Sequence, residues 1–330
     1  MRKGEKLALS EFNIIKKYLA PLAGPGAPAF SLSNDAAQYS PPPDKDLVFT
    51  KDTLVADVHF FPNDNPSLIA QKALRVNLSD LASMAAEPVG YLLSLALPKQ
   101  NFDREKWVEK FAKGLKKDQD QYGWKLWGGD TVSTAGPITI SVTAVGLVKK
   151  GLTICRSTAK PGDAIYVSGT LGDAAAGLEI IKQNFDKFEY KDLINSYYLP
   201  QPRLKIASEL AKLVTSMMDI SDGLLGDLHH ICKSSSVGAE VFAKNIPIST
   251  ALNNFLKTKK KYINLTLSGG DDYELLFTLP YENEDKIANI SNENGILLTK
   301  IGNITSGKKI KLLGVDGNEI NAEIKGYRHF

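Results

Sequence analysis

The sequence predicts an α+β fold in two domains, residues 1–150 and residues 151–330. A single hydrophobic core rarely grows beyond about 250–300 residues, and this chain has 330. Strand-like and helix-like segments interleave in both halves, and many of the strands look hairpin-connected, which favours α+β over a doubly wound nucleotide-binding fold. The turn sequence Lys160-Pro161-Gly162-Asp163 marks the boundary between the halves.

The N-terminal half alternates helices with strands. A short amphipathic helix starts at Ser10 and ends near Leu19, and residues 21–28, with their three prolines and two glycines, form a loop. Leucines and alanines at helical spacing predict a long helix that Pro88 follows, and apolar residues alternate in a later segment as in a half-buried strand. The predicted segments are helices at 66–84 and 103–121 and strands at 47–55, 89–97 and 137–148, with a further short strand before Gly128-Gly129-Asp130.

The C-terminal half starts with a strand at 164–168, a glycine-rich turn at 169–173 and a helix from Ala174. Pro200-Gln201-Pro202 separates this region from the next helix. The remaining predicted segments are a helix at 203–214, a helix that follows Gly223 and ends at Ser234, a strand at 273–279, and a last helix with two strands.

Composition excludes several classes of function. The formal net charge is only +3 and no block of five like charges occurs, which argues against nucleic acid or a membrane surface as a partner. The longest apolar stretches, such as 91–97, are too short to span a bilayer. Cys155 and Cys232 are the only cysteines, which fits a reducing compartment, and the N-terminus lacks a signal-peptide core. We therefore expect a cytoplasmic protein.

Familiar nucleotide and hydrolase motifs are absent, and aspartates stand out instead. The chain has no phosphate-binding Gly-x-x-x-x-Gly-Lys-Ser/Thr loop, no Gly-x-Gly-x-x-Gly after a strand, and no protein-kinase motif set. Most of these aspartates lie at the ends of predicted elements, often beside glycine, whereas Asp80 lies within the predicted helix at 66–84 among apolar residues. These aspartates are Asp35, Asp52, Asp80, Asp130, Asp219, Asp222, Asp271 and Asp272.

Gathered carboxylates repel one another unless cations neutralise them. Magnesium binds through one or two carboxylates together with substrate phosphates, and glycine lets backbone amides approach phosphate oxygens. Each motif also has a plain structural interpretation: Asp219 and Ser221 could cap the following helix, and Gly-Gly-Asp is often an ordinary turn. The ordered combination, rather than any single motif, therefore indicates a magnesium-bridged polyphosphate site.

In order, these segments resemble the thiamine-monophosphate kinase family, within the superfamily of aminoimidazole ribonucleotide synthetase. Two stretches are the most specific together, residues 77–80 (Asn-Leu-Ser-Asp) and residues 268–275 (Ser-Gly-Gly-x-Asp-Tyr-Glu-Leu). The other matching segments are 11–12, 34–37, 51–60, 72–84, 128–131, 156–163, 219–224 and 325–330.

The resemblance implies ATP-dependent phosphorylation of thiamine monophosphate to thiamine diphosphate. It implies a homodimer in which the mixed sheets of the N-terminal ATP- and magnesium-binding domains pair, and a C-terminal α/β sandwich-like domain that completes the substrate site. By analogy, several magnesium ions would bind Asp35, Thr50, Asp52, Asp80, Asp130, Asp219 and Asp222; the nucleotide would contact Gly129, Asp130, Arg156 and Ser221; and the thiamine substrate would contact His59, Asp271 and Tyr327.

The chain departs from the family pattern at four places. Asn34 replaces the first residue of a usual acidic pair, and Lys51 replaces a usual threonine or serine. Residues 132–135 replace a shorter turn that usually contains arginine, and Ile324 replaces a frequent aromatic residue, so Tyr327 becomes the candidate for stacking on the thiamine.

The implied reaction requires no general base, because a phosphate acceptor with a second pKa of about 6 is largely dianionic at neutral pH. We therefore expect direct in-line transfer and no catalytic side chain in that role. Two alternatives stay open: another ATP-using member of the superfamily, and a non-catalytic nucleotide-binding relative, which Asn34 and Lys51 make conceivable.

Overall fold

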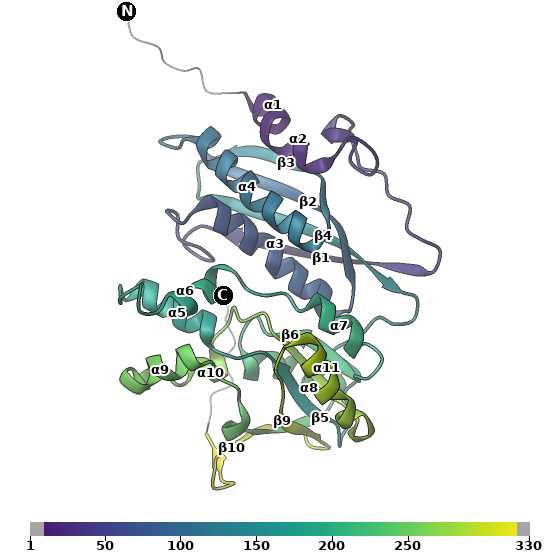
Figure 1. The fold of residues 1–330 in the computed structure, drawn as a ribbon, viewed down its shortest axis with the longest axis vertical. Coiled ribbons are helices and arrows are strands. Elements are labelled where there is room, and N and C mark those ends of the chain that lie inside the picture. The colour runs from purple at the N-terminus through teal and green to yellow at the C-terminus, as the bar shows by residue number, and fades with distance from the viewer. Residues whose placement is uncertain (1–9, 322–330) are drawn as a thin grey trace, which may run out of the picture. The chain divides into compact units, whose positions relative to one another are not determined.

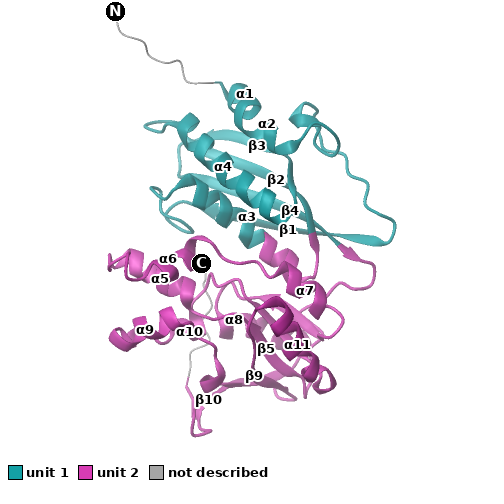
Figure 2. Cartoon of the chain, in the orientation of Figure 1, with its two compact units in different colours: residues 1–77, 88–147 teal, residues 78–87, 148–330 magenta. Residues whose placement is uncertain are grey.

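A computed structural model describes residues 10–321 of the chain (Figure 1). The chain divides into two compact units, which Figure 2 colours separately. Unit 1 comprises Met1–Asn77 and Pro88–Leu147, and unit 2 comprises Leu78–Glu87 and Val148–Phe330. The division passes through a helix, so a segment of ten residues, 78–87, is grouped with the later part of the chain.

Unit 1 is built on a four-stranded sheet with strand order β1-β4-β2-β3. Strands β2 and β3 pair in parallel, and helices α3 and α4 lie across one face of the sheet (Figure 1). The elements are β1 Lys45–Val55, α3 Pro66–Ser83, β2 Glu87–Pro98, α4 Arg104–Tyr122, β3 Lys125–Thr134 and β4 Thr139–Lys149.

Period-two patterning explains which face of this sheet the helices cover. Leu93, Leu95 and Leu97 of β2 are buried, whereas Leu92 and Ser94, which point to the opposite face, are exposed. Helix α4 begins after Asp103, whose side chain accepts the backbone N–H of Lys106, and ends at Gly123 in a left-handed conformation. The sheet therefore has one packed face and one open face.

A buried ion pair joins α3 to α4. The guanidinium of Arg75 donates to both carboxylate oxygens of Asp118, from Nε at 2.7 Å and from Nη2 at 3.0 Å. Arg75 also donates to Gln121, and both members of the pair are almost fully buried. Burial raises the pKa of Asp118 despite the hydrogen bonds and charge of Arg75 that oppose the shift.

The N-terminal helical segment extends further than the sequence predicts. It consists of α1 Glu11–Ile14, a π-helical turn at Ile15–Leu19 and α2 Ala20–Ala23, and the side chain of Ser10 caps its start. The predicted loop therefore begins at Gly24 rather than Pro21. Proline is tolerated in the first turn of a helix because the missing N–H has no partner there. A 3₁₀ turn at Phe30–Leu32 follows.

Unit 2 contains a seven-stranded mixed sheet with order β11-β10-β7-β9-β5-β8-β6. Its strands are β5 Ala164–Ser168, β6 Ser216–Asp219, β7 Gly238–Phe242, β8 Leu275–Leu279, β9 Leu298–Thr305, β10 Ile310–Leu313 and β11 Glu319–Ile320. Its helices are α5 Asp173–Lys182, α6 Lys191–Tyr198, α7 Leu204–Leu210, α8 Leu224–Ser235, α9 Thr250–Thr258, α10 Leu265–Ser268 and α11 Glu284–Asn294, with 3₁₀ turns at Ala243–Asn245, Lys260–Tyr262 and Tyr281–Asn283.

Both faces of this second sheet are covered, so unit 2 is an α/β sandwich. Ile165, Val167 and Leu276 pack with α8 on one face. Tyr166 and Phe277, which alternate with them along β5 and β8, pack with α7 and α11 on the other face. A third apolar cluster joins α5, α6 and α9.

The predicted α+β class with two sheets is confirmed, but the predicted hairpin connections are wrong. Among the described strands, β10 and β11 alone are consecutive in the chain, adjacent in a sheet and antiparallel, as a hairpin requires. Helix α4 connects the parallel strands β2 and β3, as parallel pairing requires a crossover. The sequence also failed to reveal α6, α9, β6 and β7, of which β6 is only four residues long.

Candidate active site

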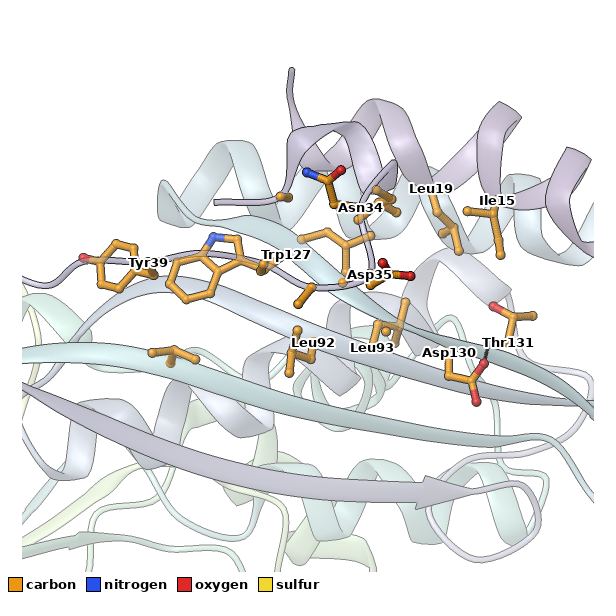
Figure 3. A pocket seen from close by; sticks show the side chains of 18 of the residues that line it. Ile15, Leu19, Asn34, Asp35, Tyr39, Leu92, Leu93, Trp127, Asp130 and Thr131 are labelled. Carbon is orange, nitrogen blue, oxygen red and sulfur yellow. Dashed lines mark hydrogen bonds between the residues drawn. The ribbon is translucent and has the colours of Figure 1, made fainter. Parts of the chain in front are cut away.

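In unit 1 the predicted site residues Asp35, Gly129 and Asp130 line one pocket of about 710 Å³ on the open face of the sheet. Figure 3 shows that its two ends differ in chemistry. Tyr39 and Trp127 lie at one end, and Asp130 and Thr131 lie at the other, with Asp35 between them. Apolar side chains, among them Leu92, form much of the remaining wall.

Gly129 brings the polypeptide chain of β3 unusually close to β2 beside Asp130. Its φ is +153°, and a Cβ at this position would lie 1.7 Å from the carbonyl oxygen of Leu93. Any side chain would therefore displace the strand. The Oδ1 atom of Asp130 accepts the backbone N–H of Thr131 at 2.8 Å. The sequence placed residues 128–130 after a strand, whereas they lie inside β3.

Three other predicted residues of unit 1 do not line this pocket. Thr50 and Asp52 are half-buried on β1, on either side of the exposed Lys51. His59 lies in the turn that follows β1, and its Nδ1 accepts the backbone N–H of Val55 at 3.0 Å. This bond gives His59 a local role in holding the turn.

In unit 2, Asp219 at the end of β6 is held by Ser79 of α3. The Ser79 hydroxyl donates to Oδ2 of Asp219 at 2.7 Å, and both residues are buried. Burial, with the negative charge of Asp80 as a second cause, raises the pKa of Asp219 well above its usual value. Two of the predicted metal ligands, Asp80 and Asp219, are therefore close enough to repel each other.

The carboxylate of Asp227 holds the loop that carries Ser221 and Asp222 through hydrogen bonds to its backbone. The Oδ2 atom of Asp227 accepts the backbone N–H groups of Ser221, Asp222 and Gly223 at 3.0, 3.1 and 3.1 Å. Asp227 is 1% exposed, and burial raises its pKa to about 7. A single buried carboxylate thus satisfies three successive donors of this loop.

A second loop, residues 268–273, is joined to the first by backbone hydrogen bonds. The N–H of Asp271 donates to the carbonyl of Ser221 at 2.9 Å, and the N–H of Tyr273 donates to that of Ile220 at 2.8 Å. A Cβ on Gly270 would lie 2.4 Å from the carbonyl oxygen of Ser221. The predicted site residues Ser221 and Asp271 therefore lie on two loops that are hydrogen-bonded to each other.

These contacts correct two expectations. Glycine amides were expected to approach phosphate, but the N–H of Gly223 already donates to Asp227, and its Cα packs against Ser268, where a Cβ would clash. Asp219 and Ser221 do not cap the following helix, because the N-cap of α8 is Gly223 and has no side-chain bond. Residues 219–223 therefore form a loop whose backbone N–H groups at Ser221, Asp222 and Gly223 donate to the carboxylate of Asp227.

The last predicted contacts are Arg156 and Tyr327. Arg156 is exposed in the segment before β5, and its carbonyl accepts hydrogen bonds from the hydroxyls of Ser234 and Ser235. Tyr327 lies outside the described residues, as does Ile324.

Within residues 10–321, no three His, Cys, Asp or Glu side chains form a ready-made group for a metal ion. In the same part of the chain, none of the helices combines the length and the apolar character that crossing a membrane requires.

Sequence reasoning missed Asp227, the bond from Ser79, and the aromatic pair Tyr39 and Trp127. Asp227 had a detectable signal, because an acidic residue in the first turn of a helix often accepts N–H groups of the preceding residues. Ser79 and the aromatic pair had none, since their partners are distant in sequence or depend on strand register.

Comparisons with known proteins agree with this architecture. The family model described as AIR synthase related protein, N-terminal domain, matches residues 33–148, and the model of the corresponding C-terminal domain matches residues 160–315. The chain is 38% identical over 328 residues to the thiamine-monophosphate kinase of Escherichia coli strain K12. This match covers 98% of this chain and 99% of the relative.

Two solved structures are similar over most of the chain. The thiamine-monophosphate kinase from Stenotrophomonas maltophilia K279a has a TM-score of 0.80 and 38% identity, and covers 88% of this chain and 91% of that chain. AaThiL complexed with AMPPCP and TMP has a TM-score of 0.77 and 32% identity, and the match covers 90% of this chain and 91% of that chain. Because relatives above 30% identity span nearly its whole length, the chain belongs to the thiamine-monophosphate kinase family of AIR synthase related proteins.

Proposed function

We propose that the chain is an ATP-dependent kinase that converts thiamine monophosphate to thiamine diphosphate. The observation that carries this proposal is 38% identity to a thiamine-monophosphate kinase over 98% of the chain. The similarity to AaThiL complexed with AMPPCP and TMP supports the same pair of substrates. In unit 1, the pocket with an apolar aromatic end and a carboxylate end has the size and polarity that a nucleotide requires.

Magnesium fits the oxygen ligands that the chain offers. The mutual repulsion of Asp80 and Asp219 in unit 2 is the kind of charge excess that a cation offsets. Magnesium needs only one or two carboxylates at a site, because water and phosphate oxygens complete its coordination. When bound, it would neutralise charge on the phosphate oxygens. The proposed ligands are Asp35, Thr50, Asp52 and Asp130 in unit 1, and Asp80, Asp219 and Asp222 in unit 2.

The chain's own residues orient the reactants rather than transfer protons. The dianionic acceptor phosphate is already nucleophilic, so no side chain has to remove a proton. Gly129, Arg156 and Ser221 are the proposed nucleotide contacts, and the guanidinium of Arg156 would pair with a phosphate. His59, Asp271 and Tyr327 are the proposed thiamine contacts. Direct in-line transfer predicts inversion at a chiral γ-phosphate, and retention would contradict it.

The open face of the sheet in unit 1 supports a homodimer in which two such sheets pair. Four apolar side chains are exposed on this sheet: Leu47 by 38%, Phe49 by 62%, Leu92 by 41% and Val132 by 49%. Leu47, Phe49 and Leu92 also line the pocket, so the proposed interface would border the nucleotide site. An apolar sheet face of this kind usually marks an interaction surface.

We assign dimerisation and ATP binding to residues 1–150, and completion of the substrate site to residues 151–330. The free thiols of Cys155 and Cys232 support our proposal of a cytoplasmic location.

The decisive experiment incubates the purified chain with ATP, magnesium and thiamine monophosphate, and measures thiamine diphosphate by chromatography. We expect one ADP for each thiamine diphosphate formed. Thiamine in place of its monophosphate serves as the control acceptor and should give no product. Absence of thiamine diphosphate at saturating magnesium, from protein that still binds ATP, would favour a non-catalytic nucleotide-binding relative.

A further inference from the structure

The hydroxyl of Ser79 bonds to a carboxylate outside its own helix. Short polar side chains inside a helix commonly donate to a carbonyl of the preceding turn. Ser83, about one turn further along α3, does so, because its Oγ donates to the carbonyl of Asp80 at 2.7 Å. The Oγ of Ser79 instead donates to Oδ2 of Asp219 at the end of β6, also at 2.7 Å. This side chain therefore links two elements of unit 2.

Both partners of this bond are shielded from water. Ser79 is 0% exposed and Asp219 is 6% exposed. A buried carboxylate needs hydrogen-bond donors, and a bond to a charged oxygen is stronger than one between neutral groups. The carbonyl oxygen of Tyr273, at 3.5 Å from the same hydroxyl, is too far away to compete for its proton. Ser79 therefore holds the carboxylate of Asp219 in one orientation.

The same serine governs the position of a second acidic side chain. Asp80 follows Ser79 directly in α3, and its negative charge acts on Asp219. Successive side chains of a helix point about 100° apart, so the bond from Ser79 leaves Asp80 directed elsewhere. Anchoring Ser79 to Asp219 thus fixes the spacing between the two carboxylates. A small cation that demands near-ideal octahedral geometry depends on ligands held in this way.

We propose that Ser79 is a positioning residue for the divalent-cation site to which Asp80 and Asp219 belong. It acts through Asp219 and does not itself touch the cation. The proposal rests on the proposed function for the identity of that cation as magnesium. Removal of a hydrogen-bond partner of a metal ligand typically weakens metal binding by about 10–100-fold.

The first test measures binding of Mn²⁺, a paramagnetic substitute for magnesium, by electron paramagnetic resonance in the absence of nucleotide. Asp219→Asn identifies the relevant sites as those that it removes. Ser79→Ala should weaken these sites about tenfold or more. Ser83→Ala, which removes a hydroxyl that bonds to the backbone of the same helix, is the matched control and should change nothing.

Melting temperatures show whether each variant is folded. Ser79→Cys, whose thiol is a weak donor, gives the same comparison if Ser79→Ala does not fold. Unchanged Mn²⁺ affinity in the folded variant would overturn the proposal, and so would the absence of Mn²⁺ binding by the unaltered chain.

The second test separates positioning from general damage. In the kinase assay, Ser79→Ala should need about tenfold more magnesium for half-maximal turnover, while turnover at saturating magnesium changes little. Ser79→Thr keeps a hydroxyl and should need less magnesium than Ser79→Ala. A loss of turnover that magnesium does not restore would indicate a structural role and overturn the proposal. If Mn²⁺ binding weakens as expected but the unaltered chain forms no thiamine diphosphate, the proposed function fails while the role of Ser79 stands.

Discussion

The Oδ2 atom of Asp227 accepts the backbone N–H of Ser221 at 3.0 Å, and the next two N–H groups of the chain donate to the same oxygen. This relationship fixes the loop that presents Ser221 and Asp222. Because the three donors are satisfied within the chain, contacts of this loop with a nucleotide must come from side chains and bound cations.

Asp227→Ala should lower both stability and turnover. Each buried donor left unsatisfied costs about 1–3 kcal/mol, and a displacement of the loop by about 1 Å would slow the reaction about 100-fold. Asp227→Asn is the matched control, because its amide oxygen can accept from the same donors. Turnover and melting temperature of both variants would be measured together. A fully active Asp227→Ala protein would show that the loop holds its conformation unaided.

Asp130→Asn should reduce turnover by orders of magnitude while the chain stays folded. The substitution removes the negative charge that a magnesium ion would need, yet the amide oxygen can still accept the N–H of Thr131. Steady-state kinetics over a range of magnesium concentrations, together with circular dichroism, provide the measurement. Near-normal activity at saturating magnesium would remove Asp130 from the proposed set of ligands.

Arg75→Ala should destabilise the chain by about 3–5 kcal/mol, because it leaves the carboxylate of Asp118 buried without its ionic partner. The double variant Arg75→Met with Asp118→Leu removes both charges and should recover most of that loss. Denaturant unfolding of the three proteins tests the difference. If the double variant were no more stable than Arg75→Ala, lost packing rather than an unpaired charge would explain the effect.

The titration of Asp272 should lower the free energy of unfolding as the pH rises above about 4. Burial raises its pKa well above the usual value, although its oxygens accept the N–H groups of Gly172 and Ala174. The folded state therefore binds a proton that the unfolded state has released, and stability declines with pH across that interval.

Asp272→Asn abolishes this titration. The unfolding free energy of the unaltered chain minus that of the variant should therefore decrease from about pH 4 towards neutrality. Urea unfolding at several pH values, with the exposed Asp44→Asn as control, measures the slope. A difference that rose with pH would mean that the carboxylate is stabilised in its charged form.

Val132→Asp should dissociate the proposed dimer. The side chain is 49% exposed on the sheet of unit 1, and a carboxylate in a paired apolar face would lose its hydration. Sedimentation velocity at micromolar concentration would detect a shift to the monomer. Phe188→Asp, at an 86% exposed position in unit 2, should leave the oligomeric state unchanged. A chain that is monomeric before substitution would refute the dimer itself.

Regular elements with strong periodicity were predictable from sequence. The helix α3 and the strands β2 and β4 lie within a few residues of their expected bounds, because each carries an apolar stripe of the correct period. The hairpin expectation failed because strand periodicity reports which side chains are buried, not which strand lies next to another. Short elements such as β6 gave too few residues for a pattern.

The sequence by itself determined the family, the α+β class, and the set of aspartates on which the proposed chemistry depends. These conclusions depend on which residues occur and in what order, and both are read directly from the sequence. The tertiary structure alone decided that Ser79 binds Asp219, 140 residues away, that Asp227 closes its own loop, and that a bulge aims Trp127 at Tyr39. Hydrogen bonds and stacking act over a few ångströms in space, and distance along the chain does not reveal them.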